Sequence, residues 1–134
     1  IKRAITETTM IEHPGTPELG FLYGVIFSGP PMSHWNVRRN VCVFADGEVD
    51  RSPTGTGVSG HLAIDQARGR MDVGDQITVE SIVGSEFTGS IAGLTTWEGR
   101  QAVIPRVSGS ARITGRSEFW YDPEDRLSQG FLLR

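Results

Sequence analysis

Residues Asp50–Gly60 read D-R-S-P-T-G-T-G-V-S-G, and this stretch decides the fold because it leads a strand and turn into the best helix of the sequence. Pro53 suits the first turn of a helix, and the side chain of Ser52 or Thr54 can cap it. Gly69 is placed to end the helix. Between these points an apolar stripe recurs at helical spacing, formed by Val58, Leu62, Ala63 and Ala67.

A glycine-rich helix start of this kind can bind an anion. The first backbone N–H groups of a helix have no partners within it, and the helix dipole adds partial positive charge there. Gly55 and Gly57 carry no Cβ, so a ligand can approach the backbone closely. A carboxylate or phosphate site and a ligand-free turn fit this local pattern equally well. It is not a P-loop, because the lysine of that motif is missing.

Strands are predicted on both sides of the helix. Two precede it, at 21–27 and 39–45, and Asp46-Gly47 then forms a tight turn. Five are predicted after Gly74, at 76–82, 87–94, 101–107, 111–114 and 117–121. Residues 1–8 are expected to end a helix, and the prolines within 11–20 predict an extended connector. The layout is α+β, with mixed or antiparallel strands wrapped around one central helix.

The composition fits one soluble domain and excludes several classes of protein. The 134 residues are 37% hydrophobic and 22% charged. A net charge of −3, with arginines scattered along the chain, excludes a broad nucleic-acid surface. No segment approaches the roughly 20 apolar residues that cross a bilayer. No secretion signal is expected, because Ile1 opens a polar, charged segment. The single cysteine, Cys42, excludes an internal disulfide framework, so a cytoplasmic location is expected.

The motif and its surroundings resemble the proline racemase family, which includes hydroxyproline 2-epimerases and trans-3-hydroxyproline dehydratases. The pattern D-R-S-P-x-G-T-G-x-S-G/A is similar to the second active-site motif of that family. Further segments also fit it: F-L-Y-G-V-I-F-S-G-P from Phe21, N-V-C-V-F-A-D-G from Asn40, E-S-I-V-G-S-E-F-T-G from Glu80 and D-P-E-D-R-L-S-Q-G-F from Asp122. The resemblance covers essentially the whole chain.

This resemblance implies one lobe of a two-lobed, diaminopimelate epimerase-like fold, with the substrate held between two helix starts. Family members are more than twice as long, and their cysteine-glycine-histidine motif is not in this sequence. Residues 1–134 are therefore expected to be the second, C-terminal lobe, a fragment that is inactive alone. Its tail, 122–134, is expected to pack on the missing first lobe, and a homodimer is expected.

The family also implies a pyridoxal-independent enzyme that acts at Cα of proline-like amino acids without a cofactor. The amides of Gly55 and Thr56 would bind the substrate carboxylate. Asp50 matches the family aspartate that binds the ring nitrogen, and Phe44 matches an aromatic residue near the ring. The implied partners are this small substrate and the first lobe, with no nucleic acid and no membrane.

Thr54 occupies the position of the second catalytic cysteine. Racemisation needs bases on opposite faces of Cα, and thiols can serve because their pKa of about 8.5 falls near helix N-termini. A threonine hydroxyl has no comparable acidity. This substitution resembles the trans-3-hydroxy-L-proline dehydratases. The leading interpretation is a hydro-lyase forming 1-pyrroline-2-carboxylate, with a first-lobe cysteine as base and Thr54 assisting. The alternatives are a racemase or 4-hydroxyproline 2-epimerase homologue of altered activity, and a non-catalytic carboxylate-binding module.

Other tempting residues have structural interpretations. Cys42 alternates with valines, which predicts a buried, inert thiol on a strand. His61 is expected to face solvent or the other lobe instead of taking part in catalysis. His13 and His34 have no partners at metal-ligand spacing, so no metal site is expected. Core or inter-lobe packing is predicted for the tryptophans, Trp35, Trp97 and Trp120.

Overall fold

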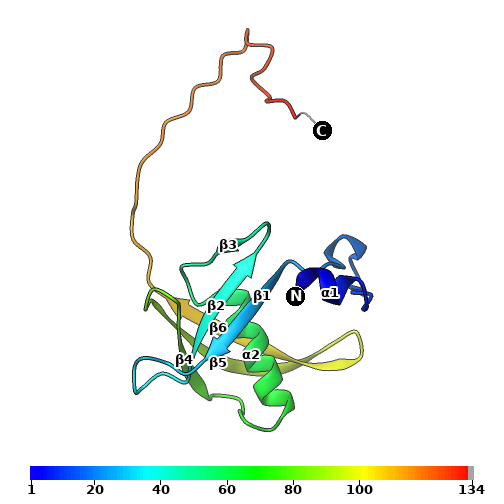
Figure 1. The fold of residues 1–134 in the computed structure, drawn as a ribbon, viewed down its shortest axis with the longest axis vertical. Coiled ribbons are helices and arrows are strands. Elements are labelled where there is room, and N and C mark those ends of the chain that lie inside the picture. Colours follow the sequence, from blue (N-terminus) through cyan, green and yellow to red (C-terminus); the bar gives the residue numbers. More distant parts are fainter. Residues whose placement is uncertain (133–134) are drawn as a thin grey trace.

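The computed structural model describes residues 1–132 (Figure 1). Its six-stranded sheet has the order β1-β2-β4-β5-β6, and β3 pairs with β2 outside that path. The strands are β1 (Gly24–Gly29), β2 (Arg38–Phe44), β3 (Glu48–Val49), β4 (Gln76–Glu80), β5 (Glu86–Trp97) and β6 (Arg100–Gly109). The pairing of β2 with β4 is parallel and the other pairs are antiparallel. The mixed α+β class is therefore confirmed.

The helical elements are α1 (Lys2–Thr6), the short 3-10 helix η1 (Pro17–Leu19) and α2 (Gly55–Ala67). The first and last of these were predicted, whereas η1 interrupts the connector that was expected to be extended throughout. No helix within residues 1–132 is long and apolar enough to cross a membrane.

Helix α2 is the element around which the twisted sheet curves (Figure 1). Val58 and Leu62 on its inner face are fully buried. Their side chains join a core cluster with residues that follow the helix: Met71, Ile77, Val79 and Ile91, flanked by Phe87, Val103 and Val107. The central strands and the helix thus bury one apolar cluster, which fixes the position of the helix start.

The limits of α2 agree with the sequence, but two details of the prediction are wrong. Gly69, with φ of 64°, follows the C-cap as expected. Thr54 occupies the N-cap position, yet neither it nor Ser52 caps the helix through its side chain, because both side chains are used within the preceding turn. Ala67 is exposed, and the charged Asp65 is buried in its place on the inner side.

The β1–β2 hairpin divides its side chains between two faces, because successive residues of a strand alternate. Directly opposed pairs share a face, and one face is turned toward α2. Its members are Gly24 with Phe44, Ile26 with Cys42, and Ser28 with Asn40. This face is apolar at the end near Phe44 and polar at the end near Asn40, and the two ends serve different purposes described below.

Residues 110–132 form no strand, so the predicted strands at 111–114 and 117–121 are wrong for this structure. The segment arches away from the lobe as an extended chain and then forms turns between Asp122 and Gly130 (Figure 1). An extended segment becomes a strand only beside a partner, and within the described residues the sheet ends at β6. Large apolar side chains along it are exposed: Ile113, Phe119, Trp120, Tyr121, Leu127, Phe131 and Leu132. The last two residues of the predicted tail, 133 and 134, lie outside the described residues.

The three tryptophans lie outside the core. Trp35, Trp97 and Trp120 are 84%, 47% and 87% exposed. The prediction of core packing is therefore wrong for this chain, and packing against another lobe stays a prediction.

Truncation of the fully buried helix side chain, Leu62→Ala, is expected to lower the free energy of unfolding by about 2–5 kcal/mol, because it opens a cavity where the helix meets the sheet. The matched control is Ile64→Ala on the same helix, where the side chain is 47% exposed and the change should stay within about 0.5 kcal/mol. Urea denaturation followed by circular dichroism measures both. Equal effects of the two variants would contradict this packing.

Candidate active site

All five residues predicted for the site line one cleft at the start of α2. The cleft has a volume of about 700 Å³. It is bounded by residues from the start of β1, the end of β2, the turn after β3 and the first turn of α2: Tyr23, Gly24, Ile26, Cys42, Phe44, Asp50, Thr54, Gly55, Thr56 and Gly57. The sequence motif supplies the polar side and the hairpin supplies the apolar side.

The turn that leads into the helix is held by Asp50. Its backbone N–H donates to the Cys42 carbonyl at 3.0 Å, which fastens the turn to β2. One carboxylate oxygen accepts the Ser52 N–H at 2.8 Å, and the other accepts the Thr54 hydroxyl at 2.9 Å. Asp50 is partly exposed to the cleft, so it retains lone pairs for a ligand.

The Asp50 carboxyl is stabilised as an anion. Burial acts to raise its pKa, but the hydrogen bonds from the Ser52 amide and the Thr54 hydroxyl, with the positive charge of Arg51, outweigh burial and lower the pKa below its ordinary value. Asp50 therefore presents a full negative charge to the cleft at neutral pH.

The mouth of α2 places several backbone amides on the opposite side of the cleft. Gly55, Thr56 and Gly57 form the first turn, where N–H groups have no carbonyl partner within the helix. The helix dipole adds positive potential at this point. At Gly57 the helix approaches β1 closely, because a Cβ there would lie 2.1 Å from Cδ1 of Ile26 and would force that side chain to move. This close approach brings the helix mouth against the hairpin.

The apolar wall of the cleft was only partly foreseen. Phe44 lines it as predicted, and Tyr23 adds a second ring whose centroid lies 5.7 Å from that of Phe44. Ile26 and Cys42 complete the wall. Cys42 is buried, as predicted, yet it also borders the cleft. The alternation of the hairpin, with Ile26 opposite Cys42, is the signal that could have identified these positions.

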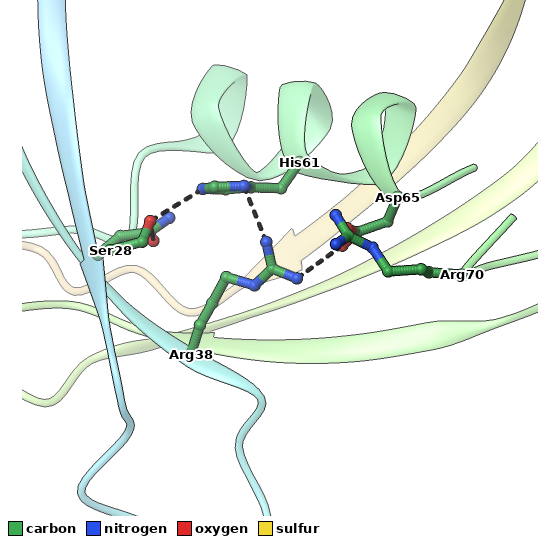
Figure 2. Close-up of polar contacts among 6 residues, drawn as sticks. Ser28, Arg38, His61, Asp65 and Arg70 are labelled. Carbon is green, nitrogen blue, oxygen red and sulfur yellow. Dashed lines mark hydrogen bonds and ion pairs between the residues drawn. The ribbon is translucent and has the colours of Figure 1, made fainter. Parts of the chain in front are cut away.

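A polar network adjoins the cleft at the other end of the same hairpin face (Figure 2). Nδ1 of His61 lies 2.8 Å from Nη1 of Arg38, and Nε2 lies 3.2 Å from the Ser28 hydroxyl. Arg38 also binds the buried Asp65 at 2.6 Å, and Arg70 binds the other oxygen of that carboxylate. His61 thus uses both ring nitrogens within this lobe while its side chain stays partly exposed, and the expectation that it also faces another lobe stays a prediction.

The groups of the cleft offer three kinds of contact. Amides at a helix start bind a carboxylate, an ionised aspartate binds an ammonium group, and aromatic and aliphatic side chains contact an apolar ring. Among residues 1–132, no group of three or more His, Cys, Asp and Glu side chains is arranged to hold a metal ion.

Comparison with known proteins gives relatives over the whole chain. A trans-3-hydroxy-L-proline dehydratase of Colwellia psychrerythraea is 46% identical over 134 residues, which are 100% of this chain and 38% of that protein. A 3-hydroxyproline 2-epimerase of Burkholderia multivorans is 44% identical, over 100% of this chain and 40% of that protein. The chain thus spans about two fifths of the length of these relatives.

A solved structure supports the same relationship. The crystal structure of a hydroxyproline epimerase from Agrobacterium vitis, with trans-4-hydroxy-L-proline bound, superposes with a TM-score of 0.80 at 38% identity. The match covers 98% of this chain and 38% of that one. Residues 1–132 also match the proline racemase sequence family. The chain therefore belongs to the proline racemase family.

Proposed function

We propose that this chain is the substrate-binding second lobe of a trans-3-hydroxy-L-proline dehydratase that uses no pyridoxal cofactor. The observation that carries the proposal is Thr54. Its side chain stands at the helix mouth, where the family has its second thiol, and its hydroxyl donates to Asp50 at 2.9 Å. A neutral hydroxyl held in this way cannot act as the second base that racemisation requires.

In this proposal the substrate carboxylate accepts hydrogen bonds from the amides of Gly55 and Thr56. The ring nitrogen lies beside Asp50, whose lowered pKa favours the charged form that binds an ammonium group. Phe44 contacts the ring. A carbanion at Cα would gain electrostatic stabilisation from the same amides, because they are preorganised and aim their dipoles at the carboxylate.

The stereochemistry of the substrate explains why one base suffices. In trans-3-hydroxy-L-proline the hydroxyl and the carboxylate lie on opposite faces of the ring, so the Cα hydrogen and the hydroxyl share a face. A single thiolate on that face can take the Cα proton and, as a thiol, return it to the departing hydroxide. Water leaves, the thiolate is regenerated, and the enamine tautomerises to 1-pyrroline-2-carboxylate. We assign that thiolate to a first lobe, outside the present sequence.

A second candidate function is epimerisation at Cα. It is favoured by the relative named 3-hydroxyproline 2-epimerase, which is nearly as similar to this chain as the dehydratase is. The two reactions share carboxylate and nitrogen binding and the first proton transfer. They differ in what happens on the face that Thr54 occupies.

The segment 110–132 fits the same proposal as a tail that packs on the first lobe. Its hydrogen bonds within the described residues stay inside the segment. The exposed tail side chains named above, from Ile113 to Leu132, include four aromatic rings. A second lobe that covers them would bury this apolar area, which is the usual source of interface stability.

The function is tested by incubating the protein, expressed from its complete reading frame, with trans-3-hydroxy-L-proline in deuterated water and following the reaction by NMR. We expect loss of water and formation of 1-pyrroline-2-carboxylate. Accumulation of the Cα-deuterated epimer without loss of water would establish the second candidate instead.

The role of Thr54 is tested by Thr54→Cys, with Thr54→Ser as the matched control. A thiol at the helix mouth restores an ionisable group opposite the first base. We expect exchange of deuterium into Cα of a proline-type substrate to rise by about 100-fold, within the range of general base catalysis. The serine variant should resemble the wild type. No gain of exchange in the cysteine variant would contradict the assignment of Thr54 to this face.

A further inference from the structure

We propose that His61 is a positioning residue for the backbone corner at Thr54, at the mouth of α2. It acts through Ser28 and Asn40, which hold the Pro53 carbonyl directly before that corner. It does so only as the neutral tautomer with its proton on Nε2. His61 lies next to the cleft but does not line it. The inference concerns how the chain keeps the site of the proposed function in shape.

The direction of the hydrogen bonds follows from the chemistry of the two ends. At one end, Nη1 of Arg38 can only donate, so Nδ1 of His61 at 2.8 Å must accept. At the other end, the Pro53 carbonyl can only accept, so Nδ2 of Asn40 at 3.3 Å donates to it. Oδ1 of Asn40 then faces Ser28 as an acceptor.

The middle of the network has one solution. The Ser28 hydroxyl donates to Oδ1 of Asn40 at 2.9 Å. Its oxygen is then free to accept, and Nε2 of His61 at 3.2 Å supplies the proton. The order of donation is therefore Arg38, His61, Ser28, Asn40, Pro53. The Arg38 end requires neutral His61 with the proton on Nε2, and the Pro53 end agrees because it requires that Nε2 carries a proton.

The last acceptor connects this network to the cleft. Asn40 is 1% exposed and Pro53 is fully buried, so their hydrogen bond is shielded from water. The Pro53 carbonyl and the Thr54 N–H belong to one peptide group, and that N–H donates to the Ser52 hydroxyl oxygen at 3.0 Å. The peptide is thus held at both ends, directly before Thr54, whose φ of 67° needs such support.

The charges around His61 favour its neutral form. Burial lowers the pKa of His61 below its ordinary value, the positive charge of Arg38 from β2 lowers it further, and Asp65 one turn along α2 opposes this effect. The ionised Asp65 carboxylate is bound by Arg38 and Arg70, so their positive charges offset much of its effect on His61. The other contact, Ser28 of β1, is uncharged.

Protonation of His61 would turn Nδ1 into a donor that faces the Arg38 guanidinium. Because the folded protein binds this proton less readily than the unfolded chain, the stabilising contribution is complete above the ordinary pKa of about 6.5 and is lost as pH falls through the lowered pKa. Asp50 has a lowered carboxyl pKa, so this carboxyl stays ionised through the neutral range.

The test uses the protein expressed from its complete reading frame, labelled with ¹⁵N-glycine and ring-¹⁵N-histidine, in wild-type, His61→Gln, His61→Leu and His34→Gln forms. The glutamine at position 61 can accept from Arg38 and donate to Ser28 but cannot titrate, and His34 is an exposed matched control. NMR spectra from about pH 5 to 8 follow the amides of Gly55 and Gly57 and the His61 ring nitrogens. Activity against trans-3-hydroxy-L-proline is measured over the same range.

We expect the His61 ring to be protonated on Nε2 at neutral pH, and the Gly55 and Gly57 amides to titrate together with it. That titration should persist in His34→Gln and vanish in His61→Gln. The His61→Gln variant should keep activity within about three-fold of wild type and should no longer lose kcat/KM at acidic pH. His61→Leu should lower kcat/KM by about 10- to 100-fold, the scale of a displaced site. Only the kinetic measurements rest on the proposed function.

The positioning role would be overturned if the Gly55 and Gly57 amide shifts did not change as His61 titrates. It would also be overturned if they changed equally in His61→Gln. Wild-type activity in His61→Leu would do the same. Absence of turnover by every form, including wild type, would refute the proposed function, while the NMR titration would still decide the role of His61.

Discussion

The corner at Thr54 is the point where the turn after β3 becomes α2, and its backbone φ of 67° is one that a β-branched residue adopts only when its neighbours hold it there. Such a conformation costs about 1–3 kcal/mol. The contacts that offset this cost come from three directions: the N–H reaches Ser52, the hydroxyl reaches Asp50, and the Thr54 carbonyl accepts the Val58 N–H at 2.8 Å as the helix begins.

This single constraint sets several properties of the cleft together. It turns the first amides of α2 toward the space beside Phe44, and it directs the Thr54 hydroxyl onto Asp50, which helps to keep that carboxyl ionised. The group that would bind the ring nitrogen and the group that replaces the second thiol are therefore linked by one hydrogen bond. A change at either residue alters both the charge and the shape of the cleft.

The sequence was sufficient wherever the required contacts are local. The motif 50–60 carries its own turn, helix start and first-turn amides within eleven consecutive residues, so the residues that gather at the helix mouth could be predicted from the sequence. The network of Ser28, Asn40 and His61 could not, because its members lie up to 33 residues apart and meet only through the hairpin register. The strands predicted within 111–121 do not form, for a related reason. Alternation of apolar and polar residues indicates an extended chain, but a strand also needs an adjacent strand to bond with.

Among the described residues, the segment 110–132 is the last to be synthesised. If it packs on a first lobe, as proposed, that lobe remains incomplete until the ribosome has finished the second one. The two lobes would then complete their folding together and not one after the other. Contacts between distant parts of the chain slow folding. Loss of the segment 110–132 would consequently destabilise the first lobe as well as this one.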